Sequence, residues 1–147
     1  MGGTAGKTGK KRNASAADAP DREQEDPDAG RVNLVVVLGE VSAAPELREL
    51  ESGRRLAALA IRSRGADGRA TSVPVTVWEP AAWVEDLAPG TEVVVVGGVR
   101  RRFFRTATGT SATRVDVEAA FIGRAGQRRQ LEGAMRRVES ALEALLS

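Results

Sequence analysis

The stretch Val73-Pro-Val-Thr-Val-Trp78-Glu79 decides the fold, because it combines the alternation of a β-strand with an aromatic ring on the unexpected face. Successive side chains of a strand point to opposite faces of its sheet. The three valines share one face, which we expect to be buried. Trp78 shares the other, solvated face with Ser72, Pro74 and Thr76. An exposed aromatic side chain at the end of a strand is a platform for a flat ligand, for which a nucleobase is the candidate.

The composition argues against catalysis. The chain has 147 residues, of which 41% are hydrophobic, and it contains no histidine and no cysteine. Without these two residue types the common metal-ligand sets and the usual acid–base or nucleophile pairs cannot be built. The sequence therefore predicts a binding protein rather than an enzyme, with no catalytic residue, no metal and no cofactor. No apolar run has the length of a membrane span or a secretory signal, so we expect a cytoplasmic protein with no membrane partner.

Three segments of different character follow one another. Residues 1–30 contain no Leu, Ile, Val, Phe or Trp, and a basic block at 7–12 precedes an acidic one at 18–28. Such a segment cannot bury enough apolar surface to fold, so we expect a disordered charged arm. It is either a solvated arm or a weak electrostatic contact with nucleic acid. Residues 31–123 predict an all-β unit, and residues 124–147 predict a helix.

The all-β unit has five expected strands. They cover residues 32–38 (running on towards 47), 56–63, 71–78, 92–105 and 113–122, with a short helix over 81–87. Pro80 suits the start of that helix, Trp83 is expected to pack across the barrel end, and Gly97-Gly98 permits a bend in the fourth strand. Five strands with a helix between the third and fourth is the order of an OB-fold barrel, a small closed sheet that binds oligonucleotides.

Cations and aromatic rings alternate at the end of the fourth expected strand, Arg100-Arg-Arg-Phe-Phe-Arg105. Whichever face is outward, it offers guanidinium groups for phosphates and a ring for a base, and Arg62 and Arg64 add charge on the second strand. Two other readings stay open. The arginines could guard a solvated edge against aggregation, and a subunit contact could bury Trp78.

The C-terminal segment carries an amphipathic stripe. Its apolar residues are spaced 4, 3, 4 and 3 apart: Leu131, Met135, Val138, Leu142 and Leu145. This spacing indicates a helix with one apolar face, too short to stand alone as a coiled coil. The helix therefore needs a partner surface, which is its own barrel, a second subunit or another protein.

At these positions the chain resembles the bacterial single-stranded DNA-binding proteins over residues 31–123. The resemblance rests on Val32-Asn33, Gly39, Pro45-Glu-Leu-Arg48, Ser52-Gly53, Val75-Thr-Val-Trp78, Pro89-Gly90, Val93 to Arg102 with the aromatic that follows, and Val115-Asp-Val-Glu-Ala119. It implies an OB-fold that oligomerises as a tetramer or dimer and wraps single-stranded DNA. Trp78 and Phe104 fall where that family carries base-stacking aromatics.

The chain also departs from the family pattern. Ser72 stands where the family has an aromatic residue, and the hairpin after the second strand is cut down to Gly65-Ala-Asp-Gly68. We therefore expect weaker binding or a shorter site. The sequence given ends on the predicted helix and not on an acidic tip that recruits other enzymes, so that recruiting role is not carried over.

The main hypothesis is sequence-independent binding of single-stranded DNA in replication, repair or recombination. The expected contacts are Trp78, Phe104, Arg48, Arg62, Arg64, Arg100, Arg102 and Arg105. An assembly module that has kept the barrel but lost DNA binding is the alternative, and an RNA-binding barrel would use the same chemistry.

Overall fold

Residues 31–146 are described by the structure, a computed structural model, except for the side chain of Phe104. The expected arm over residues 1–30 lies outside the described residues. The elements are β1 (Val35–Val41), β2 (Glu46–Glu49), β3 (Arg55–Arg64), β4 (Ala70–Trp78), α2 (Ala82–Glu85), β5 (Glu92–Arg105), β6 (Ser111–Arg124), α3 (Arg128–Glu143) and the short 3-10 turn η2 (Ala144–Leu146). Within this range, no helix is long and apolar enough to cross a lipid bilayer.

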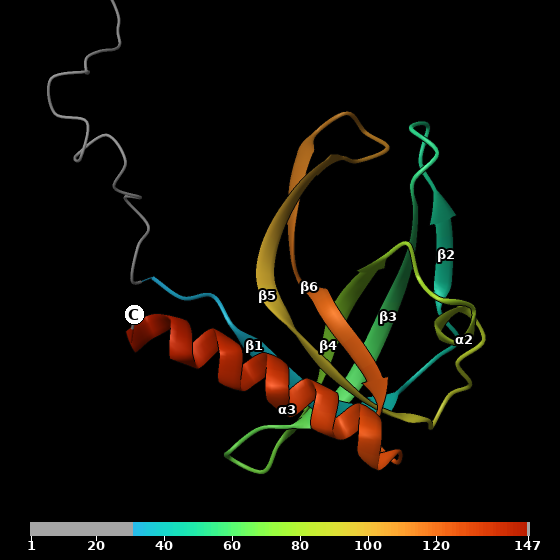
Figure 1. The fold of residues 1–147 in the computed structure, drawn as a ribbon. Helices are drawn as coiled ribbons and strands as arrows, with labels where there is room; N and C mark the ends of the chain where they lie inside the picture. The colour runs from blue at the N-terminus through green and yellow to red at the C-terminus, as the bar shows by residue number, and fades with distance from the viewer. Residues whose placement is uncertain (1–30, 147) are drawn as a thin grey trace, which may run out of the picture. The chain divides into compact units, whose positions relative to one another are not determined.

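The strands form one closed barrel with an additional strand at its side. Their order is β1-β5-β6-β4-β3-β2, and a further β1–β3 pairing closes the ring. All pairings are antiparallel except β4–β6, which is parallel with Val75 opposite Val117. With α2 between β4 and β5 (Figure 1), this is the OB-fold order, and the predicted fold class is confirmed.

The first expected strand is two strands in the structure. β1 ends at Val41 and β2 begins at Glu46, so the chain between them leaves the sheet. Both strands pair with β3: Val41 lies opposite Ile61, and Leu47 lies opposite Ala57. The long β3 therefore pairs with three strands, β1, β2 and β4, and β2 is the strand that the five-strand prediction did not contain.

The core is built from alternating apolar side chains of the barrel strands. Its buried members on the strands are Val37, Val41, Ala57, Leu59, Ile61, Val75, Val77, Val93, Val95 and Val117. Val84 of α2 and Leu87 after it join this core, and Trp83 packs against it half-buried. The predicted packing role of Trp83 is therefore confirmed. Helix α2 is shorter than expected, because the helical turn already ends at Glu85.

Gly97 marks the bend in β5. The pairing with β6 shifts register between Val96 and Gly97, so that Val96 lies opposite Phe121 and Gly97 opposite Ala119. A Cβ atom on Gly97 would lie 2.0 Å from the backbone oxygen of Glu118. Only glycine permits this close approach of the two backbones, as the sequence predicted for a bend here.

Helix α3 packs on its own barrel (Figure 1). Ala134 is buried against Val94 and Val96 of β5, with Leu131, Val138, Leu34 and Phe121 around them. The predicted stripe is therefore only partly right, because Met135 stays 58% exposed, and Leu142 and Leu145 are exposed too. Ala134 was not part of the predicted stripe, and its small side chain lets the helix approach the sheet. Because Ala134 faces the sheet, Met135 and Leu142 of the predicted stripe are turned partly towards solvent.

Candidate nucleic-acid interface

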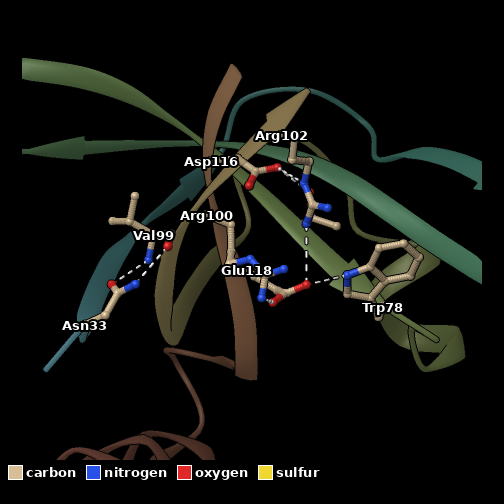
Figure 2. Close-up of polar contacts among 8 residues, drawn as sticks. Asn33, Trp78, Val99, Arg100, Arg102, Asp116 and Glu118 are labelled. Atoms are coloured by element: carbon tan, nitrogen blue, oxygen red, sulfur yellow. Dashed lines mark hydrogen bonds and ion pairs between the residues drawn. The ribbon is translucent and has the colours of Figure 1, made fainter. Parts of the chain in front are cut away.

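Trp78 is the last residue of β4, and its indole ring is half-buried. Its Nε1 donates a hydrogen bond to Oε2 of Glu118 at 2.6 Å (Figure 2). The guanidinium carbon of Arg54 lies 4.0 Å from the ring centroid, and that of Arg102 lies 5.6 Å from it. The ring is thus on the face opposite the core valines, as predicted, but it is not freely exposed.

Glu118 of β6 connects the cations to the tryptophan (Figure 2). Besides the indole, its carboxylate accepts hydrogen bonds from Nη1 of Arg100 at 3.1 Å and from Nη2 of Arg102 at 3.5 Å. The strand pairing explains this convergence, because β6 lies between β5, which carries the arginines, and β4, which carries Trp78. One carboxylate therefore holds three predicted contact residues of two strands next to one another: Trp78, Arg100 and Arg102.

Asp116 is a second carboxylate on the same side of β6 and is only 4% exposed. It accepts hydrogen bonds from Oγ1 of Thr76 at 2.7 Å and from Nε of Arg102 at 3.0 Å. Thr76 is 6% exposed, so the expectation that its face of β4 is solvated is wrong there. The physical reason is that β6 pairs beside β4 and covers Thr76 with the Asp116–Arg102 pair.

Arg54 is held over Trp78 by an unusual turn. Glu79, directly after Trp78, has a φ of 47°, in the left-handed region that a non-glycine residue adopts only at a cost. Two hydrogen bonds to Arg55 offset this cost: the amide of Glu79 donates to the Arg55 carbonyl at 2.8 Å, and Oε2 of Glu79 accepts from the Arg55 amide at 3.2 Å. Oε2 also lies 3.9 Å from Nε of Arg54.

The other predicted cations lie apart from this cluster. Arg62 and Arg64 are opposite Ser72 and Ala70, about 20 Å or more along β4 from Trp78. Arg48 is opposite Leu56, which is itself opposite Trp78, so Arg48 lies two strands away in the same row, at about 10 Å.

Arg105 and Phe104 are near the far end of β5. Arg105 lies opposite Ser111, and its Nη1 donates to the carbonyl of Gly109 at 3.2 Å. Alternation places Arg105 on the face opposite to Arg100 and Arg102. Phe104 pairs with Ala112 through the backbone, and its side chain is outside the described part of the structure.

Sequence reasoning missed Arg54, Asp116 and Glu118. Arg54 comes directly before β3, whose Leu56 is opposite Trp78, so a correct β3–β4 register would have located it. Asp116 and Glu118 alternate with Val115 and Val117 on β6, which was a visible signal that one face of this strand is acidic. Their partners come from β4 and β5, and only the sheet order reveals those neighbours.

A small closed barrel with this strand order, which carries an aromatic ring and two nearby guanidinium groups at a strand end, defines a protein of the OB-fold class. The model of the single-strand binding protein family matches residues 32–125, and the chain belongs to that family. The resemblance that the sequence suggested is therefore confirmed.

Two curated relatives give the extent of the similarity. The chain is 33% identical over 101 residues to a single-stranded DNA-binding protein of Mycolicibacterium smegmatis, a match that covers 60% of this chain and 61% of that protein. It is 34% identical over 106 residues to a single-stranded DNA-binding protein of Corynebacterium glutamicum, covering 64% of this chain and 47% of the relative. The chain thus spans about half to three fifths of the length of these relatives.

Proposed function

We propose that this protein binds single-stranded DNA without sequence preference, by stacking a base on Trp78 and holding phosphates with arginines. The observation that carries the proposal is the ring of Trp78 with the guanidinium groups of Arg54 and Arg102 close to it, on a barrel of the single-strand binding protein family. The protein is then a cytoplasmic binding protein and not an enzyme, and it acts in replication, repair or recombination.

A base can displace Arg54 from the ring of Trp78. A cation over an aromatic ring at a largely exposed site contributes about 0.5–1 kcal/mol. A stacked base contributes about 1–3 kcal/mol, so the exchange favours the base. The side chain of Arg54 is 55% exposed and has its only close carboxylate, within the described residues, 3.9 Å away in Glu79. Once displaced, its guanidinium group is free to contact a phosphate.

The arginines of the cluster differ in how easily they can turn to DNA. The side chain of Arg100 is 58% exposed and bound to one carboxylate, and such surface pairs contribute only about 0–1 kcal/mol. Arg102 is held by the buried Asp116 and by Glu118, so its main role is to fix the cluster. The proposed path continues along the barrel over Arg48, Arg62, Arg64 and Phe104, and Arg105 is proposed to meet DNA from the other face of β5.

Fluorescence titration with a thymidine oligomer of about 35 nucleotides tests the proposal. The Trp83→Phe protein is used, because Trp78 is then the only tryptophan of the chain. We expect quenching on binding, with an affinity that falls as salt is raised. A matched RNA oligomer as competitor separates DNA from RNA binding. A protein that neither binds nor changes its fluorescence at low salt would overturn the proposal.

Glu118→Gln is expected to tighten binding. The substitution removes a negative charge that neutralises Arg100 and Arg102, while the amide oxygen still accepts a hydrogen bond from Trp78. We expect the dissociation constant to fall roughly twofold to fivefold and the salt dependence to steepen, because one more cation is available for a phosphate. The measurement is the same titration at two salt concentrations. Unchanged affinity and slope would mean that these arginines do not meet DNA.

An assembly role is the second candidate, and exposed apolar side chains favour it. Val36 and Leu38 on β1, and Met135 and Leu142 on α3, are each about half exposed or more. Their burial between subunits would support a homo-oligomer, a dimer or a tetramer, whether or not DNA binds. If the thymidine oligomer does not bind, the assembly module becomes the better reading of the barrel.

A further inference from the structure

We infer that the hollow between the bend of the β5–β6 pair and helix α3 is a second nucleotide subsite, next to Trp78, in which Arg137 of α3 contacts the phosphate. This inference rests on the proposed function, since it extends the path of the same DNA strand. It makes the C-terminal helix part of the binding surface and not only a cover for the barrel.

The hollow has room for one nucleotide. Its volume is about 530 Å³, within the range of small-molecule sites. Trp78 and Arg100 line one part of it, and Arg137 and Ala141 of α3 line another. Between them, small residues line the sheet: Gly97, Gly98, Ala119 and Ala120. Such a surface leaves room for a flat ring to lie against the strands.

The rim of the hollow is rigid where Asn33 lies. The side chain of Asn33 accepts a hydrogen bond from the amide of Val99 and donates one to its carbonyl, each at 2.8 Å (Figure 2). This pair ties the segment before β1 to β5 just beyond the bend. The segment before β1 is therefore fixed to β5 where it lines the hollow, and its Leu34 also packs against α3.

The charge of the hollow suits a phosphate. Its charged side chains are Arg100, Arg137 and Glu118, which sum to one positive charge. Glu118 is already bonded to Trp78 and Arg102. Arg137 has no carboxylate partner within the described residues; its Nη1 lies 3.5 Å from the carbonyl of Ala120, and its guanidinium carbon lies 5.6 Å from the ring centroid of Phe121. Its charge is therefore available to a ligand.

Continuity with Trp78 identifies the ligand as the next nucleotide of a single strand. Trp78 lines the hollow, so a strand whose base stacks on this ring has its neighbouring nucleotide at the entrance. A guanidinium group is suited to hold a phosphate there, because it donates several hydrogen bonds in a plane. Arg100 and Arg137 approach the hollow from the sheet and from the helix, and they can hold the backbone on its two sides.

The first test compares Arg137→Ala with Arg136→Ala, which removes the same charge from an exposed position of the same helix that does not line the hollow. With the thymidine oligomer, we expect Arg137→Ala to weaken binding roughly threefold to tenfold and to lower the salt slope by about 0.7. Arg136→Ala is expected to change both much less. Equal effects of the two variants would overturn the subsite.

A second pair of variants tests the space and not the charge. Ala141→Leu fills the hollow and is expected to weaken binding with an unchanged salt slope, whereas Ser140→Leu adds the same side chain at an exposed position outside it. Thermal unfolding of each variant checks that the fold is kept. If Arg137→Ala and Ala141→Leu match their controls while Trp78→Ala weakens binding, only the subsite falls. If the unchanged protein does not bind DNA, the proposed function falls as well.

Discussion

Replacing Trp78 with alanine is expected to weaken binding of single-stranded DNA by about 1–3 kcal/mol, roughly a fivefold to 150-fold loss in affinity. The substitution removes the ring on which we expect a base to stack. It leaves the core valines of β4 in place, since these point to the opposite face, and Glu118 keeps Arg100 and Arg102 as partners. The measurement is the anisotropy of a labelled thymidine oligomer, which does not depend on tryptophan emission.

Trp83→Phe is the matched control, because it removes the other tryptophan from a position that packs against the core. We expect its affinity for the oligomer to equal that of the unchanged protein. Thermal unfolding of both variants shows whether the barrel is retained. If a folded Trp78→Ala protein kept full affinity, Trp78 would not be part of the binding surface. The proposal would then have phosphate contacts by arginines but no ring at this position on which a base stacks.

Gly97→Ala is expected to have the largest effect on stability. Its Cβ would lie 2.0 Å from the backbone oxygen of Glu118, a distance that forces the β5–β6 ladder apart at the bulge. Backbone cannot yield as the end of a flexible side chain does. We therefore expect the free energy of unfolding to fall by about 3 kcal/mol or more, measured by chemical denaturation.

Gly126→Ala is the control for this substitution. A Cβ at Gly126 would have no atom within 4 Å, so the added methyl group meets open space. We expect a change within about 0.5 kcal/mol, typical of a surface position. If Gly97→Ala were equally harmless, the close approach of the two backbones at the bend would not be a requirement of the fold.

The fold could be predicted wherever one strand face is apolar. Both ends of β5 were predicted correctly, at Glu92 and Arg105. Its four consecutive valines, and the alternating side chains after them, are typical of a strand. The separation of β1 from β2 could not be predicted, since it depends on β3 pairing with both strands. Likewise, the stripe on α3 placed Met135 at the contact, but the barrel surface selected the small Ala134.

The residue types of the candidate site could be predicted from the sequence, but the contacts between these residues could not. Trp78, Arg100 and Arg102 were expected to act on DNA, and the structure brings them together around Glu118. The sequence could not reveal that Arg54 covers the ring or that Asp116 holds Arg102, because these contacts join strands whose register is unknown from the chain alone. Acidic residues on a strand near the expected cations, such as Asp116 and Glu118, therefore belong in the prediction of such a site, because they can bind these cations.

The order of the strands along the chain differs from their order in the barrel, and this difference affects how the barrel can fold. β1 finds its main partner in β5, with Val35 opposite Gly97, and β4 finds β6, with Val75 opposite Val117. When two strands far apart along the chain pair, the chain loses the entropy of loop closure before any contact between them has formed. We therefore expect this topology to fold more slowly than a helical domain. The β3–β4 hairpin, joined by a short turn, can form first. During synthesis, β1 can therefore pair with β3 only at Glu40 and Val41 until β5 has emerged, and α3 finds its packing partners only after β5 and β6 have been made.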